Sequence, residues 1–181
     1  MRATGNSSWI TGIIVAIIVI YGIVAFNKIS TRDEQVTTAW TPLASALELR
    51  YASVPALARS IIMYTGQDDE TTKDLIKDQQ AYMAANTVLG KATAANEIEE
   101  DLTRITVEGG QLYPGIQSHY QFTTLLGNFA ASQQKMGPAL DAYNLAADAY
   151  NTYIRKFPNN VIAAVLGFKR AAYIKKAIAG G

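Results

Sequence analysis

The chain contains no cysteine and a single histidine, His119, and these two scarcities exclude whole classes of chemistry. Without cysteine there is no disulfide, no Cys-ligated zinc, no iron–sulfur cluster and no thiol nucleophile. A Ser-His-Asp triad would have to use His119, and a site that needs several histidines cannot form within one chain. Charged residues are also few, 17 % of 181, and nearly balanced at +1. Since nucleic-acid-binding signatures are absent as well, nucleic acid is not indicated as a partner. The composition argues against most familiar enzymes.

One long apolar run stands near the N-terminus. Ile10–Phe26 carries no charge over seventeen residues, which as a helix would span about 25 Å. Trp9 and Tyr21 lie near its ends, where aromatic rings favour the membrane interface. The run predicts a retained single-pass transmembrane helix at residues 9–26, preceded by a short tail at 1–8.

Two other interpretations of this run are a buried core helix and a cleaved signal peptide. A core helix would have one polar side, and the run has none. A signal peptide would have a more basic start than Arg2 alone and a better cleavage site than one ending in Ala25. Basic residues flank both ends, Arg2 on one side and Lys28 with Arg32 on the other, so the positive-inside rule sets no orientation.

The rest of the chain has helical periodicity, because apolar residues recur at steps of three and four and strand-like alternation is nowhere sustained. Turn signals divide it, and the helices expected are 27–65, 69–108, a third from Phe122 to Phe157, and 160–178. Pro42 and Pro55 should bend the first of these without ending it, and Pro138 should kink the third.

These helices predict an all-α fold. A transmembrane helix would be followed by one domain over residues 27–181, an elongated antiparallel helical bundle of three long helices and one short C-terminal helix. Helices of about 40 residues would each be about 60 Å long, and the short turns between them make neighbours antiparallel.

The third helix carries an unusually regular apolar seam, with steps of four and three over five heptads. Tyr143-Asn144 and Tyr150-Asn151 lie seven residues apart on it. A tyrosine in the seam buries its ring but needs a partner for its hydroxyl, and the adjacent Asn amide could bond to a neighbouring helix and fix its register. A peptide- or helix-recognition surface is the alternative.

Charge is distributed unevenly along the chain. Residues 66–108 hold ten acidic and four basic side chains, whereas residues 159–181 hold four basic side chains and no acid. Solvated helix faces are the plain interpretation; electrostatic complementarity of the basic end with an acidic helix, a neighbouring subunit or anionic lipid is the functional one. The candidate interaction residues are Lys169, Arg170, Lys175 and Lys176, opposite Glu97, Glu99, Glu100 and Asp101.

No catalytic, metal or cofactor site is predicted. A di-iron helical bundle needs Glu-x-x-His twice, and Ile116 stands three residues before His119. The acidic cluster around Glu99 lacks the loop geometry of a calcium site. Gly109-Gly110 is too short for a phosphate-binding loop.

Motifs in the C-terminal half resemble those of the LemA family, in which Y-N…Y-N-x-x-I-x-x-F-P leads to a G-F pair. The matching residues here are Ala142-Tyr143-Asn144, Tyr150-Asn151-Thr152-Tyr153-Ile154, Phe157-Pro158-Asn159-Asn160, Ala163 and Gly167-Phe168. Tyr113-Pro114-Gly115-Ile116 with Phe122, and further upstream Ala39-Trp40 and Leu47–Tyr51, are similar to other family stretches. The resemblance covers about residues 23–175. The family's arginine-rich stretch before the first Y-N is replaced by residues 133–138.

The resemblance implies a bacterial, membrane-anchored helical bundle with no established enzymatic activity or cofactor, and some members of the family are linked to assembly of membrane compartments such as the magnetosome. We therefore expect a non-enzymatic scaffold or interaction module at the bacterial cell membrane or an intracellular membrane compartment. Its partners would be the bilayer, through residues 9–26, and other copies of the chain or another membrane protein. No small-molecule substrate is indicated.

Two further hypotheses belong to other classes. The protein could be an envelope signalling component that transmits a state through the anchor, or an uncharacterised enzyme that uses His119. The residues expected to serve packing or interaction are Trp40, Tyr143, Asn144, Tyr150, Asn151, Phe157, Pro158, Phe168, Lys169, Arg170, Lys175 and Lys176.

Overall fold

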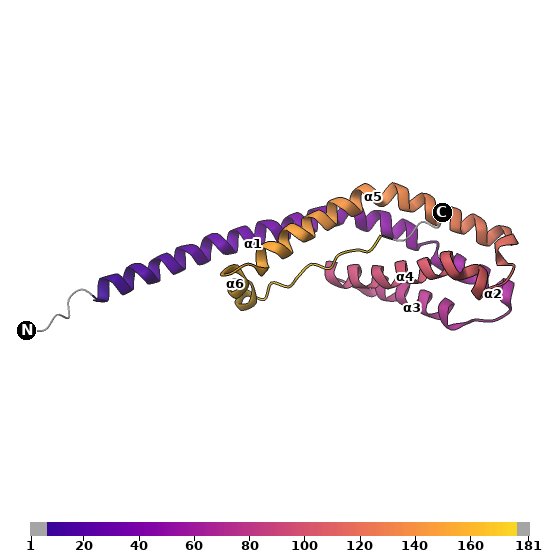
Figure 1. The fold of residues 1–181 in the computed structure, drawn as a ribbon, viewed down its shortest axis with the longest axis horizontal. Coiled ribbons are helices and arrows are strands. Elements are labelled where there is room, and N and C mark those ends of the chain that lie inside the picture. The colour runs from indigo at the N-terminus through magenta and orange to yellow at the C-terminus, as the bar shows by residue number, and fades with distance from the viewer. Residues whose placement is uncertain (1–6, 177–181) are drawn as a thin grey trace, which may run out of the picture.

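The computed structural model describes residues 7–176, and over that part of the chain the fold is all-α, without a strand. Its elements are α1 (Ser7–Tyr51), α2 (Val54–Thr65), α3 (Glu70–Ala84), α4 (Val88–Leu112), the short 3₁₀ helix η1 (Ile116–Ser118), α5 (Tyr120–Arg155) and α6 (Asn159–Leu166). Figure 1 shows an elongated molecule in which α1 and α5 lie side by side as a spine. The α3–α4 hairpin packs against the half that lies away from the N-terminus.

Helix α1 continues from the apolar run into the packed body without a break, through Pro42. The large apolar side chains of the run point outward; Ile17, for example, is 61 % exposed. By length and composition this helix is apolar enough to cross a membrane, a test that a signal sequence near the N-terminus would also pass.

The seam of α5 packs along α1. Trp40 lies edge-on to the Tyr143 ring, with 5.2 Å between ring centroids. Most of the remaining seam residues are buried, namely Phe122, Phe129, Met136, Leu140, Ala147, Tyr150 and Ile154. Helix α5 continues through Pro138 without a break, and it contacts α2 and η1 as well as α1.

The expectation of three long helices is wrong in two places. Instead of one helix over 69–108 there are two antiparallel helices, because Thr87 starts a new helix by accepting a hydrogen bond from the Gly90 backbone N–H (3.0 Å). The first helix does not run on to 65 either. It ends at Tyr51, and Pro55 falls in the first turn of α2, where a missing N–H costs nothing.

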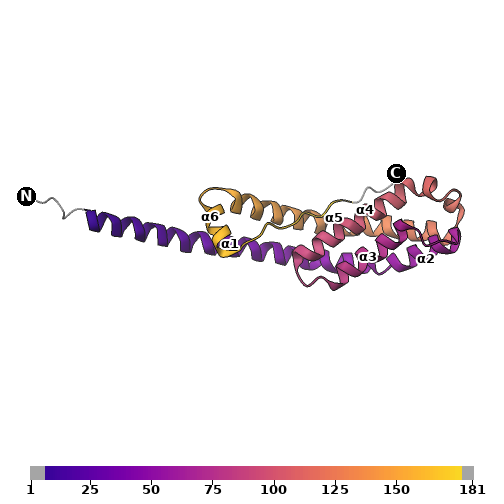
Figure 2. The same ribbon diagram turned by 90° about the horizontal axis from the view of Figure 1, so that it is seen from below.

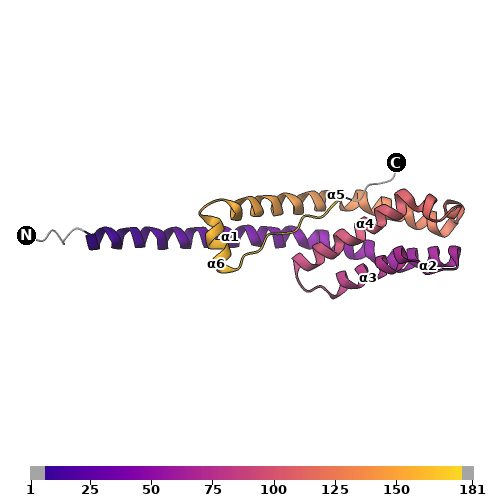
Figure 3. The same cartoon turned by 60° about the horizontal axis from the view of Figure 1, so that its bottom comes forward.

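The last expected helix, 160–178, is also shorter than predicted. Helix α6 ends at Leu166, and Gly167 takes a left-handed conformation (φ 77°) that closes the helix. Residues 168–176, which we call the strap, leave the helix and run back along the body in an extended path, as Figures 2 and 3 show.

Candidate functional site

The two tyrosines of the Tyr-Asn units bind the main chain of the strap. The Tyr143 hydroxyl donates to the Ala172 carbonyl (2.7 Å), and the Tyr150 hydroxyl donates to the Lys169 carbonyl (2.9 Å). Burial raises the pKa of each hydroxyl to about 12, with the Asp33 carboxylate contributing at Tyr150. Both hydroxyls therefore keep their proton at neutral pH and remain donors.

The two asparagines bind the strap more completely than the tyrosines do. The Asn151 amide donates to the Ala171 carbonyl and accepts from the Ala171 N–H, both at 2.9 Å. Asn144 makes the same pair of bonds with Ile174, at 2.9 and 3.0 Å. Because a side-chain amide carries a donor and an acceptor side by side, it replaces the partner that a strand would supply. These bonds go to the strap and not to a neighbouring helix.

The seven-residue spacing of the Tyr-Asn units has a geometric reason in this arrangement. Seven residues of α5 rise about 10.5 Å. The strap residues they bind are three positions apart, and three residues of extended chain also cover about 10 Å. Asn144 binds residue 174 and Asn151 binds residue 171, so the strap runs antiparallel to α5 with its groups in register.

Helix α4 closes the strap from the other side. The Asn96 amide donates to the Tyr173 carbonyl and accepts from the Lys175 N–H, both at 2.7 Å. The Lys175 ammonium lies 2.8 Å from the Glu100 carboxylate, an exposed pair that lowers the pKa of Glu100 and raises that of Lys175. The predicted complementarity between the basic end and the acidic helix is thus satisfied within one chain at this position.

Two of the four basic side chains predicted as interaction residues form ion pairs within the chain. Besides Lys175, Lys176 lies 2.8 Å from the Asp141 carboxylate on α5. Lys169 and Arg170 are exposed near the start of the strap. The pair that stays available to a partner therefore lies at the α6 end of the body.

Glu99 is not part of an exposed acidic face. Its carboxylate is buried and binds the Arg50 guanidinium through two bonds, 2.8 Å from Nε and 3.0 Å from Nη2. The Tyr51 hydroxyl donates to the same carboxylate (3.1 Å). Burial and the Glu99 charge hold the pKa of Tyr51 well above its usual range.

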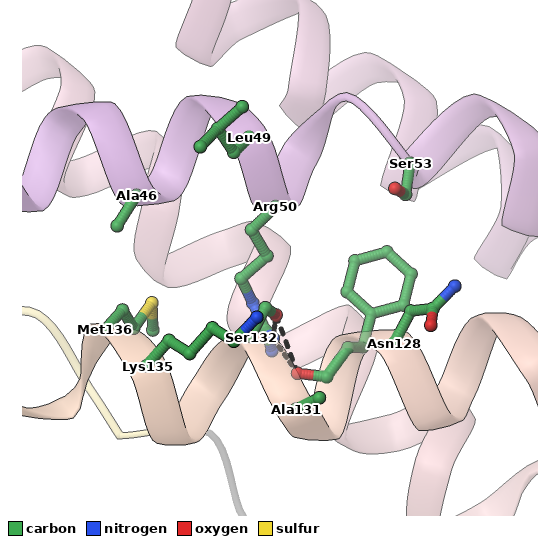
Figure 4. Close-up of a pocket in the computed structure, with 10 residues that line it drawn as sticks. Ala46, Leu49, Arg50, Ser53, Asn128, Ala131, Ser132, Lys135 and Met136 are labelled. Atoms are coloured by element: carbon green, nitrogen blue, oxygen red, sulfur yellow. Dashed lines mark hydrogen bonds between the residues drawn. The ribbon is translucent and has the colours of Figure 1, made fainter.

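A surface hollow of about 410 Å³ lies between α1 and α5 next to Arg50. Figure 4 shows Arg50 pointing from α1 across to α5, where its Nη1 donates to the Phe129 carbonyl and to the Ser132 hydroxyl (2.6 Å). Since the guanidinium is bonded on every nitrogen, it has little capacity left for an anion in the hollow. The Arg50–Glu99 pair joins α1, α4 and α5 and is a packing device.

Within residues 7–176 there is no group of three or more His, Asp or Glu side chains that could hold a metal ion. His119 forms the N-terminal boundary of α5, and its ring lies 5.8 Å from that of Tyr64. The Asn and Tyr side chains described on α4 and α5 bind the extended main chain of the strap.

The other predicted residues fall at the α6 end. Phe168 begins the strap and packs half-buried against Phe26 of α1, with 6.1 Å between ring centroids. Phe157 is 83 % exposed in the turn before α6, next to Pro158.

Sequence reasoning missed three participants. The role of Asn96 on α4 was not predicted. The buried ion pair of Arg50 with Glu99 was not predicted either, because Glu99 stands in an acidic stretch of the sequence. The third is Asn159, which accepts a hydrogen bond from the Tyr21 hydroxyl (2.8 Å). The glutamate's position among the buried residues of α4, at the apolar spacing of Ala92, Ala95, Ile98, Leu102 and Ile105, was the available signal for the ion pair.

Comparison with known proteins gives one family and two relatives. A model described as the LemA family matches residues 39–179, which is most of the chain. Two proteins of Paramagnetospirillum magneticum (strain ATCC 700264 / AMB-1), named magnetosome protein MamQ 2 and magnetosome protein MamQ 1, are each 35 % identical to this chain over 68 residues. That stretch is 38 % of this chain and 25 % of either relative, so the similarity spans about a quarter of their length.

Proposed function

The chain belongs to the LemA family, and from that premise we propose that it is a non-enzymatic, membrane-anchored scaffold or protein-interaction module. In this proposal residues 9–26 cross a bilayer and the helical body projects from it. The body binds other copies of the chain or another membrane protein through the outer faces of its helices. The protein would lie in the bacterial cell membrane or in an intracellular membrane compartment.

The continuity of α1 is the observation that carries the proposal. The helix is 45 residues long and links the apolar run to the packed body without a turn. Residues 27–51 alone extend about 37 Å beyond the run. A flexible linker would let the body rotate freely, whereas a continuous helix holds its faces at a fixed height and angle to the bilayer.

Exposed apolar side chains on the body are the proposed contacts. Leu49 on α1, Met63 on α2 and Leu145 on α5 are 79 %, 74 % and 72 % exposed.

The test is the particle mass of the full-length protein after gentle solubilisation from its membrane. We expect particles that contain more than one copy or a second membrane protein, and we expect Leu145→Glu or Met63→Glu to reduce them to single copies. Gln80→Glu, at an exposed position on α3, adds the same single negative charge and should leave the particle unchanged. Wild-type particles with one copy and no co-purifying protein would contradict a scaffold.

Signalling through the anchor is a second candidate, favoured by the same continuous helix. The scaffold and the signalling hypotheses predict different neighbouring proteins. Proximity labelling from the body, with and without residues 9–26, should label a histidine kinase or protease only in the anchored form if the protein signals. Structural membrane proteins among the labelled neighbours would favour the scaffold.

A further inference from the structure

Helix α6 is fixed to the apolar run of α1 by a hydrogen bond between side chains. The Tyr21 hydroxyl donates to the Asn159 Oδ1 at the first residue of α6 (2.8 Å). Tyr21 lies five residues before the end of the run at Phe26, which is about 7.5 Å along the helix axis. Because of this bond, the start of α6 lies at the level of the run and not beyond it. Figure 2 shows α6 crossing α1.

The side chains of α6 suit an apolar environment. Its eight residues, NNVIAAVL, include no charge. The Asn159 amide donates to the Tyr153 carbonyl (3.2 Å), and the Asn160 Oδ1 accepts from the Val161 N–H (3.0 Å). Several of its polar groups thus have partners within the chain, which lowers the cost of removing them from water.

The backbone at the end of α6 is satisfied in the same way. The N–H groups of Gly167 and Phe168 return to carbonyls of the last turn, so the helix closes on itself. In hydrocarbon an unpaired backbone group is costly, because no water is present to bond with it. The closure removes part of that cost.

An apolar hollow joins α6 to the run. Its volume is about 430 Å³, and four residues of each helix line it, among them Ile23 and Phe26 of α1 and Val161 and Val165 of α6. Val165 is 78 % exposed and Val161 52 %. Half of this hollow belongs to the run itself, so whatever solvent surrounds the run also fills the hollow.

Basic side chains flank α6 in the sequence, both before and after it. Arg155 and Lys156 precede it, and Lys169 and Arg170 follow it, all exposed. Lys28 is the first charge after the run on α1. Long basic side chains next to an apolar surface can reach the headgroup level of a bilayer while their stems stay in contact with the apolar layer.

We propose that α6 is a second membrane-contacting element, which lies in the outer part of the same leaflet as the end of the run, with lipid acyl chains in the hollow between α6 and α1. The charge-free run, about 25 Å, is shorter than a hydrocarbon core of about 30 Å. A bilayer that covers the run from end to end therefore also covers the start of α6. This inference rests on the proposed membrane crossing of residues 9–26.

The absence of native cysteine allows a direct test with single spin labels in the full-length protein. Val165→Cys reports on α6, Ile17→Cys on the run, and Val107→Cys of α4 on the body. These side chains are 78 %, 61 % and 58 % exposed, so the label displaces no core. The protein is reconstituted into vesicles of mixed zwitterionic and anionic phospholipid, and the accessibility of each label to oxygen and to a water-soluble nickel chelate is measured.

We expect the labels at 17 and 165 to be accessible to oxygen and protected from nickel, and the label at 107 to be accessible to nickel. A label at 17 in lipid with a label at 165 in water would overturn this inference and leave the membrane crossing intact. A label at 17 in water would overturn the crossing, and α6 with it. If Val165→Cys misfolds by circular dichroism, Val161→Cys gives the same comparison on the same helix.

Discussion

Asn151 and Ala171 exchange two hydrogen bonds, both 2.9 Å long, so one side chain satisfies both main-chain groups of a residue twenty positions later. Asn144 repeats this with Ile174 one heptad earlier. An isolated extended segment would leave these groups to water or, where buried, unpaired. The Tyr-Asn units supply what a neighbouring strand supplies in a sheet.

Replacing Asn151 by Ala should therefore release the strap before it affects the helices. Removal of the amide leaves the half-buried N–H and C=O of Ala171 without partners, which should lower the free energy of unfolding by about 1–3 kcal/mol. Urea denaturation measures this change, and amide hydrogen exchange should become faster within residues 168–176. Asn128→Ala, an exposed position on the same helix, is the control. Equal effects of the two variants would contradict the assigned role.

The buried Arg50–Glu99 pair should respond differently to single and double substitution. Glu99→Ala leaves the Arg50 guanidinium buried without its partner and should cost about 3–5 kcal/mol of folding free energy. Arg50→Met combined with Glu99→Leu removes both charges and should cost much less folding free energy. Thermal and urea denaturation of the single and double variants test this. Lys175→Ala breaks an exposed pair and should have little effect by comparison. A double variant as unstable as the single one would show that the ion pair itself stabilises the fold.

Asp101 should make the protein less stable as the pH rises. One of its carboxylate oxygens is buried without a hydrogen-bond partner, and burial together with Asp78 and Asp74 raises its pKa from 3.8 to about 6. The folded state therefore binds a proton at Asp101 more tightly than the unfolded state does. Ionisation of Asp101 thus lowers the free energy of unfolding, and this penalty is absent below about pH 4 and complete above about pH 6.

Asp101→Asn should remove this penalty. Because the group is only half-buried and water screens its charge, the gain in unfolding free energy at neutral pH should be on the order of 1 kcal/mol. The gain should vanish below about pH 4. Unfolding curves of both proteins across this range give the measurement, and a gain that does not change with pH would rule out titration as its cause.

Lys169 and Arg170 should favour anionic lipid around the protein. Each basic side chain near an anionic surface contributes about 1 kcal/mol, so Lys169→Glu with Arg170→Glu should reduce the preference for anionic over zwitterionic lipid by roughly tenfold or more at low salt. Spin-labelled lipids of the two kinds report this preference in vesicles. High salt should weaken the preference of the wild type, and Lys77→Glu should leave it unchanged.

Periodicity predicted the helices better than their ends. The seam of α5 and the apolar run of α1 were evident because they repeat over many turns. The break between α3 and α4 depends on one threonine hydroxyl at Thr87, and the break before α2 on where Pro55 falls within a turn. Such single-residue signals compete with an apolar pattern that continues across them.

The strap could not be predicted from its own residues. The apolar spacing of Val161, Val165, Phe168 and Ala172 fits a helix well. The extended path is favoured by partners distant in the sequence, Asn96 on α4 and the Tyr-Asn units on α5, which bind its main chain. Asn144 and Asn151 were recognised as hydrogen-bonding devices, but their partners are tertiary and not local.

The unbroken α1 also couples the orientation of the body to the thickness of the bilayer. A span that is longer or shorter than the local hydrocarbon core adjusts by tilting. Since no joint separates the span from the body along α1, a tilt of about 10° would swing Tyr51 sideways by roughly 6 Å at the end of its 37 Å arm. Local thinning or thickening of a membrane would thereby become a lateral displacement of the surface that meets other proteins.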